Sequence, residues 1–170
     1  MPLEENLIQQ RGETHWYAIR VFSRKMEPLL SVLTQKGVEH FHPEEVIKSL
    51  VFLKTTESFI NTFRNEHYQE VWVYTRPKSS TPAIIPDKEM DIFMFVCTAG
   101  KKGMMYLGED RPEYHVGDRV RVTEGPLKGI EGHIRRIKKD RRIIVSINGL
   151  VAVATTFIPP QFLEVIQEEK

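Results

Sequence analysis

The stretch that decides the fold of this 170-residue chain is VGDRVRVTEGPLKGIEGHIRRI, residues 116–137. It contains two runs that mix β-branched and polar residues, Arg119–Thr123 and Ile130–Ile137, with glycines between them. Alternation of apolar and polar residues predicts half-buried strands, and glycine permits the tight turns that connect such strands. The stretch therefore predicts the beginning of a small all-β unit.

The residues that follow continue this pattern. Three more strands are predicted, at Arg142–Ile147, Leu150–Thr156 and Phe162–Val165, and Asn148-Gly149 between the first two is a strong type I′ hairpin signal. Five short strands in about 55 residues leave no room for a helix and predict a small β-barrel. We assign this five-stranded barrel to residues 114–166 and a tail to residues 167–170.

The sequence before this region mixes helical and strand patterns. We expect a first helix from about Met26 to Lys36, a second that carries Phe59, Ile60 and Phe63, and a third that begins at Pro86. Oxygens of Thr55, Thr56 and Ser58 are available to cap the second helix. Strands are predicted at residues 15–22, 38–42, 46–54 and 71–75. The order β-α-β-β-α-β-α predicts an α+β domain over residues 15–97, with a four-stranded antiparallel sheet and three helices.

The remaining segments read as connections. Residues 1–14 are expected to be a flexible N-terminal segment, and residues 98–113, rich in glycine and charge, are expected to be a linker between two domains. Within this linker, Met104–Leu107 is apolar and could pack on either domain.

Composition excludes several classes of protein. Hydrophobic residues are 41% and charged residues 28% of the chain, which is typical of a globular protein, and the net charge of +1 excludes a wholesale polycation. The one cysteine, Cys97, cannot form an internal disulfide and is expected to be a small core residue. No apolar run approaches the length needed to span a bilayer. We expect a cytoplasmic monomer without a membrane partner.

Chemistry-bearing patterns point away from an enzyme. The glycines of residues 125–132 lack the Gly-Lys-Ser/Thr of a phosphate-binding loop. His40 and His42 alternate on one strand, but no third metal ligand lies nearby in the sequence. We therefore expect no catalytic residues, no metal and no cofactor.

Taken together, the motifs resemble a known family. Residues 116–137 look like a KOW motif, and four segments resemble parts of the NusG N-terminal domain: Trp16-Tyr17, Val21-Phe22-Ser23, Ser49–Leu53 and Ile85–Met90. With the linker, the resemblance covers residues 15–166. The chain is similar to NusG-type transcription elongation and antitermination factors, and most like the specialised RfaH-like and UpxY-like paralogues.

The resemblance implies a function. The N-terminal domain would bind the clamp helices of RNA polymerase and suppress pausing and termination. Specialised members also touch the non-template DNA strand, and some act on particular operons such as those for surface polysaccharides. The KOW domain would recruit a second partner, such as a small-subunit ribosomal protein. The alternative is a ribosome- or RNA-binding KOW protein that does not act on polymerase. Residues 15–96 carry ten basic and ten acidic side chains, which speaks against this alternative.

The resemblance also implies residue roles in the N-terminal domain. Leu50 lies where family members usually have an aromatic residue that faces the polymerase, and Phe52 and Tyr74 would accompany it. Polar residues Asn61 and Thr62 would contact the opposite jaw of the polymerase. For each of these, ordinary core or surface packing is the alternative. Arg20, Arg24 and Lys25, where the first strand meets the first helix, would bind DNA phosphates, or would form a solvated loop.

In the KOW domain, Ile130 and Asn148 lie where NusG has partner-facing aromatic residues, so Rho binding is not expected. Six cations with one acidic residue could contact RNA, or could be a solvated hairpin: Arg135, Arg136, Lys138, Lys139, Arg141 and Arg142. RfaH can refold its C-terminal domain as a helical hairpin, but β-branched residues dominate 143–147 and 150–156 here. We therefore expect a constitutive barrel.

Overall fold

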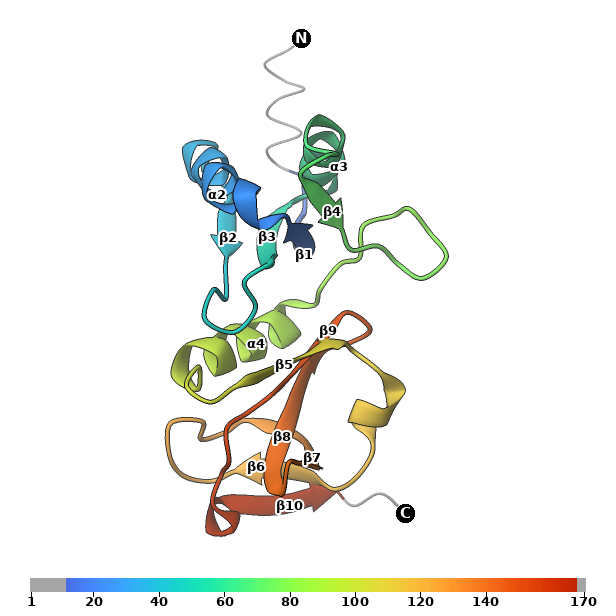
Figure 1. Ribbon diagram of the computed structural model, residues 1–170. Coiled ribbons are helices and arrows are strands. Elements are labelled where there is room, and N and C mark those ends of the chain that lie inside the picture. The colour runs from blue at the N-terminus through green and yellow to red at the C-terminus, as the bar shows by residue number, and fades with distance from the viewer. Residues whose placement is uncertain (1–11, 168–170) are drawn as a thin grey trace. The chain divides into compact units, whose positions relative to one another are not determined.

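The computed structural model describes residues 12–167 and divides into two compact units, Met1–Asp87 and Lys88–Lys170. Most of the N-terminal segment expected at 1–14, and most of the tail expected at 167–170, lie outside the described residues. Figure 1 shows the elements of each unit, and each unit is described below by itself.

The first unit is built on a four-stranded antiparallel sheet with the order β2-β3-β1-β4. Its central strand β1 pairs with β3 from Thr14 opposite Thr56 to Arg20 opposite Leu50, and with β4 on its other side. The strands are β1 (Thr14–Val21), β2 (Glu39–Phe41), β3 (Leu50–Thr56) and β4 (Val71–Val73). The predicted four-stranded antiparallel sheet is confirmed.

Two helices, α2 (Met26–Gln35) and α3 (Glu57–Glu66), cover one face of this sheet. Alternate residues of β1 and β3, such as Ile19 and Val51, pack against the apolar faces of both helices. Thr56 is the N-cap of α3, because its Oγ1 accepts a hydrogen bond of 3.1 Å from the Phe59 N–H. The helix carrying Phe59, Ile60 and Phe63 is therefore as predicted, and Phe63 is buried.

One strand boundary in this unit was misplaced by the sequence pattern. The third strand was expected at residues 46–54, but β3 begins at Leu50. Val46 and Ile47 are apolar, yet their N–H groups both bond to the carbonyl of Pro43 in a turn. Ile47 is nevertheless buried, so its apolar character reflects packing rather than strand pairing.

The second unit contains α4 (Asp87–Ala99) and an antiparallel sheet of six strands in the order β10-β6-β7-β8-β9-β5. The order is open, with β10 and β5 at its edges, so the predicted closed five-stranded barrel is not what the pairing gives. The strands are β5 (Met105–Glu109), β6 (Arg119–Val122), β7 (Glu131–Ile137), β8 (Asp140–Ile147), β9 (Val151–Ala154) and β10 (Leu163–Gln167).

Strand β5 supplies the sixth strand, and it lies inside the segment expected to be a linker. Met105 pairs with Ala154 and Glu109 with Val151. The linker segment also holds a 3-10 helix, Pro112–His115. The apolar run Met104–Leu107 explains the difference, because Met105 and Leu107 pack against Ala152 and Ala154 rather than remaining in solvent. The domain boundaries at residues 97 and 114 stay predictions, although α4 belongs to the second compact unit.

The type I′ turn lies at the opposite end of β8 from the one that the sequence predicts. Asn148-Gly149 is not a type I′ turn, because only Gly149 has a positive φ and the turn closes from the Leu150 N–H to the Ile147 carbonyl. The two successive positive φ angles of a type I′ turn occur instead at Lys138 (50°) and Lys139 (76°).

Candidate functional site

The residues expected to face a polymerase lie on the sheet face of the first unit that α2 and α3 leave uncovered. Leu50 and Phe52 alternate with Val51 and Leu53, which belong to the helix-covered core. The Leu50 and Phe52 side chains are 1% and 0% exposed, and the Phe52 ring stacks on Phe41 at 6.4 Å. Because both side chains are buried, they could contact a polymerase only after a change that exposes them.

The polar residues expected at a polymerase jaw both lie on α3, but they differ in exposure and in their contacts within the unit. Asn61 is half-buried, and its Oδ1 accepts a hydrogen bond of 2.8 Å from Arg64. Arg64 also donates to the Ser80 carbonyl at 2.8 Å, so Asn61 helps to tie α3 to the loop after β4. Thr62 is exposed, which leaves it the more accessible of the two.

Tyr74 and Arg20, which the sequence placed in two different sites, are neighbours. The Arg20 guanidinium donates to the Tyr74 hydroxyl at 3.2 Å, and Arg20 is paired across the strands with Trp72. The Trp72 and Tyr74 rings are 4.7 Å apart in an edge-to-face arrangement. Tyr74 is only 7% exposed, whereas Trp72 is 54% exposed. Tyr74 therefore supports Arg20 and Trp72 and offers little surface of its own.

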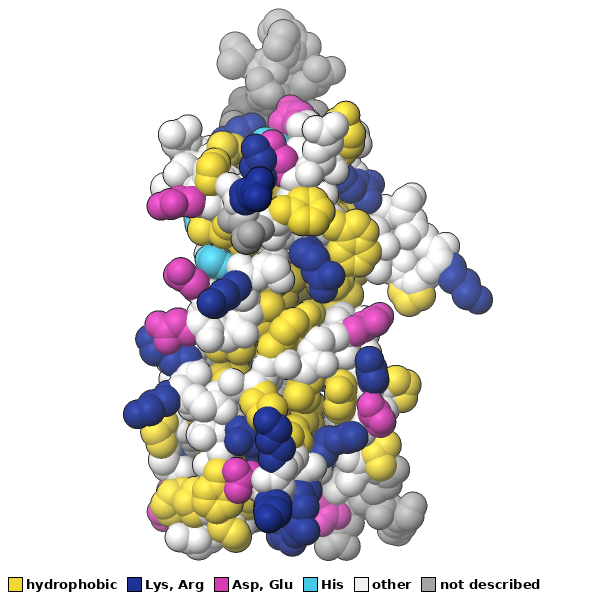
Figure 2. Space-filling view, viewed as in Figure 1, with side chains coloured by type: hydrophobic (Ala, Val, Ile, Leu, Met, Phe, Trp, Pro, Cys, Tyr) yellow, Lys and Arg dark blue, Asp and Glu magenta, His cyan; other side chains and the backbone are white. Residues whose placement is uncertain are grey.

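Exposed aromatic and basic side chains continue beyond this pair along the end of β1. Phe22 is 60% exposed and directly follows β1, and its N–H bonds to the carbonyl of Glu70 just before β4. Arg24 and Lys25 are exposed on the 3-10 helix that comes next. Figure 2 shows hydrophobic side chains beside Lys and Arg side chains on the first unit. We call this set the aromatic-basic surface: Arg20, Phe22, Arg24, Lys25, Trp72 and Tyr74.

Sequence reasoning missed Phe22 and Trp72 as members of this surface. Trp72 stands between Val71 and Val73 on β4, and both valines are buried. Strand alternation therefore required Trp72 to point to the opposite face, a signal that was available in the sequence.

In the second unit, the two residues expected to face a partner differ in exposure. Ile130 is buried beside the loop that follows β6, whereas Asn148 is exposed. The Asn148 N–H donates to Glu89 of α4 at 3.0 Å, and the Gly149 N–H donates to Asp110 at 2.8 Å. Two carboxylates thus hold the backbone of this turn, and the Asn148 side chain is its exposed part.

The six cations around the β7–β8 turn fall into two groups. Arg135 donates to the Glu113 carbonyl at 3.0 Å and lies over the Tyr114 ring at 5.2 Å. Arg142 donates to the carbonyls of Gly103 and Thr155. These two arginines therefore tie the hairpin to the rest of the unit. The other four are exposed at the end of the hairpin: Arg136, Lys138, Lys139 and Arg141.

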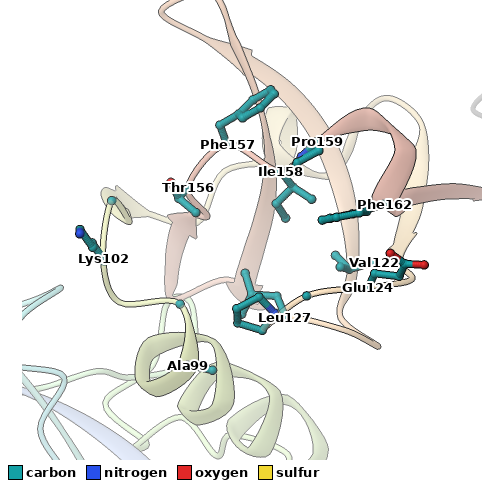
Figure 3. Close-up of a pocket in the computed structure, with 14 residues that line it drawn as sticks. Ala99, Lys102, Val122, Glu124, Leu127, Thr156, Phe157, Ile158, Pro159 and Phe162 are labelled. Carbon is teal, nitrogen blue, oxygen red and sulfur yellow. The ribbon is translucent and has the colours of Figure 1, made fainter.

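An apolar cavity of about 500 Å³ opens on the second unit, between the loop after β6 and the segment after β9. Figure 3 shows Leu127, Ile158 and Phe162 among the side chains that line it, with Phe157 at its edge. Neither Ile130 nor Asn148 lines this cavity. The cavity is therefore not formed by the two expected partner-facing positions.

Metal-ligating and nucleophilic residues are used structurally. His40 and His42 each hydrogen-bond a backbone carbonyl, of Val38 and Lys48. Among residues 12–167, no three His, Cys, Asp or Glu side chains gather as a metal site would require, and no helix is long and apolar enough to cross a membrane. Burial raises the pKa of the Cys97 thiol to about 12, so the reactive thiolate is disfavoured.

No family model matches the sequence, and no curated protein matches it significantly. A solved structure that describes domain interaction in NusG of Thermotoga maritima is similar, with a TM-score of 0.50 and 18% sequence identity. The match covers 91% of this chain and 98% of that chain. The chain has a NusG-like fold. This likeness spans both units, and at 18% identity it supports the fold and not the RfaH-like or UpxY-like subtype.

Proposed function

We propose that the protein is a transcription elongation and antitermination factor that binds the clamp helices of RNA polymerase through its first unit. The observation that carries this proposal is the composition of one sheet face in the NusG-like fold. The apolar residues Leu50 and Phe52 on β3 lie on the face opposite α2 and α3, and Arg20 and Trp72 extend that face to the β1–β4 edge. Interfaces of this kind rely on a few aromatic and arginine anchors.

A pull-down of RNA polymerase by the full chain tests this assignment. Leu50→Ala and Leu53→Ala remove equal volume from the same strand, but on opposite faces, and each costs about 2–5 kcal/mol of stability. We expect Leu50→Ala to lose polymerase binding and Leu53→Ala to retain it, at a temperature where circular dichroism shows both variants folded. Equal binding by the two variants would contradict the assignment of this face.

The aromatic-basic surface is suited to single-stranded DNA, and we assign it the non-template strand. Trp72 and Phe22 present exposed rings on which bases can stack, and Arg20, Arg24 and Lys25 supply charge for phosphates. Stacking on one ring contributes about 1–3 kcal/mol per base. Trp72→Ala should therefore weaken binding to a single-stranded oligonucleotide about fivefold or more.

Tyr68 provides the matched control for this test, because it is an exposed aromatic residue of the same unit outside the surface. Tyr68→Ala should leave the fluorescence anisotropy titration unchanged. A loss shared by both variants would argue against a defined site.

If the factor is operon-specific, read-through in vitro will depend on a 5′-leader element, whereas equal read-through on every template would indicate a general factor.

The second unit is assigned the recruitment of a further partner, with Asn148 and the apolar cavity as the accessible features. The alternative function, an RNA- or ribosome-binding protein that does not act on polymerase, is favoured by the exposed cations of the β7–β8 turn. Sedimentation with ribosomes separates the two, because a structural ribosomal protein stays bound in high salt and a transiently recruited factor does not.

A further inference from the structure

The β7–β8 turn holds two lysines in the left-handed backbone conformation, which other residues adopt more readily. Lys138 and Lys139 form the two-residue loop between the paired residues Ile137 and Asp140, with φ angles of 50° and 76°. A type I′ turn prefers Asn-Gly, because both positions are left-handed: glycine has no Cβ to be strained there, and asparagine tolerates this region better than most residues. Asn-Gly would therefore stabilise this turn more than the two lysines do.

The strands that lead into this turn carry a second unfavourable arrangement. Arg136 lies directly opposite Arg141, and Arg135 lies directly opposite Arg142. Like charges in directly opposed positions destabilise an antiparallel pair. The hairpin thus accepts both backbone strain and charge repulsion at the same end.

Other arginines of this unit form ion pairs with carboxylates. Arg121 pairs with Glu131 at 2.9 Å and faces Glu164 at 3.9 Å, while Arg142 pairs with Asp140 at 3.6 Å. In contrast, among residues 12–167, no carboxylate lies within ion-pair distance of four exposed side chains, which we call the cationic tip: Arg136, Lys138, Lys139 and Arg141. Their charge is available to an anionic partner outside the chain.

We propose that the cationic tip binds the phosphate backbone of double-helical RNA. Residues 134–145 contain no aromatic side chain, so the hairpin offers no platform for stacking the bases of a single strand. The four cations lie on the turn itself and on the second residue pair from it, Arg136 and Arg141. The narrow major groove of A-form RNA brings the phosphates of both strands close together, whereas the major groove of B-form DNA is wide. A compact group of cations therefore suits RNA better than DNA.

The proposal is independent of polymerase binding, which is assigned to the other unit. It is tested with the full chain by fluorescence anisotropy against two RNA duplexes of unrelated sequence, over a range of salt concentrations. Lys138→Asn with Lys139→Gly removes two charges and installs the preferred turn sequence, so this variant should be more heat-stable than the parent chain. We expect it to bind both duplexes more weakly, with a salt dependence reduced by about two phosphate contacts.

The control variant, Lys88→Gln with Lys128→Gln, removes two exposed lysines elsewhere in the same unit and should keep the parent affinity and salt dependence. Arg136→Gln with Arg141→Gln should weaken binding as the turn variant does. Unchanged RNA binding by the turn variant, or an equal loss in the control, would overturn the proposal. Equal affinity for a DNA duplex of the same sequence would overturn the assignment to RNA.

Discussion

Two glycines of the motif in residues 116–137 are needed for different physical reasons. Gly129 has a φ of 93°, and an added Cβ would meet nothing within 4 Å. Gly132 has no such φ, but an added Cβ would lie 2.4 Å from the Ile144 carbonyl oxygen of the neighbouring strand. The first position requires a backbone conformation, and the second requires space.

This difference predicts distinct outcomes for asparagine at the two positions. Gly129→Ala should cost about 1–2 kcal/mol, and Gly129→Asn less, because asparagine tolerates the left-handed region. Gly132→Ala and Gly132→Asn should both cost about 3 kcal/mol or more, because the backbone of β8 would have to move. Urea denaturation of the four variants measures these costs. Recovery by asparagine at position 132 would contradict the steric explanation.

The buried thiol of Cys97 predicts a pH dependence of stability. Its pKa is raised from 9.0 to about 12, so between these values the unfolded chain releases a proton that the folded chain retains. The free energy of unfolding should therefore fall as pH rises from 9 to 12, by up to about 1.4 kcal/mol per pH unit. Below pH 9 the thiol is protonated in both states and contributes no slope.

Cys97→Ala isolates this effect, since other groups titrate equally in both chains. Urea unfolding at pH 8 and at pH 10.5 should show a smaller loss of stability for Cys97→Ala than for the parent. Parallel losses would mean that Cys97 does not stay protonated in the folded chain.

At the scale of single elements, substitution of the N-cap residue of α3 tests how much the cap stabilises the helix. Thr56→Ala removes the acceptor for the Phe59 N–H and should cost about 1 kcal/mol. Thr56→Ser keeps the hydroxyl and should be close to the parent. Thermal unfolding followed by circular dichroism measures both, and equal destabilisation by the two substitutions would show that the methyl group rather than the cap matters.

Elements with a strong local signal were predictable from the sequence, and those set by distant contacts were not. The two helices and four strands of the first unit, and α4 of the second unit, follow from apolar periodicity and capping residues. The local sequence predicts a linker where β5 lies, because the pairing of β5 with β9 involves residues more than forty positions away. Asn148-Gly149 predicts a type I′ turn, but only Gly149 has a positive φ, and the two N–H groups bond to the carboxylates of Glu89 and Asp110, which lie far away in the sequence.

The candidate site was less predictable than the fold. The sequence identified Arg20 and Tyr74 separately, and their hydrogen bond emerges only from the pairing of β1 with β4. Likewise, the basic run of residues 135–142 reads as one charged stretch. Only the contacts of Arg135 and Arg142 separate the cations that hold the hairpin from those that are exposed.

For the whole molecule, α4 begins at the point where the chain divides into two compact units. The sequence placed α4 in the first domain, whereas the compact units divide after Asp87. We expect a fragment of residues 88–170 to be more stable than one of residues 98–170, by about 2 kcal/mol or more. The shorter fragment loses the Glu89 carboxylate that binds the Asn148 N–H. Equal urea midpoints for the two fragments would favour the boundary predicted from the sequence.

The pairing of β5 with β9 has a consequence for solubility. Val151–Ala154 is fully buried and uncharged, and its two valines favour a strand. An unpaired strand edge of this kind is a template for another chain. Strand β5 occupies the side of β9 that β8 leaves open. Loss of β5 would leave β9 as an unpaired edge strand. Copies of the chain would then aggregate by pairing through β9, even with every other strand of the sheet intact.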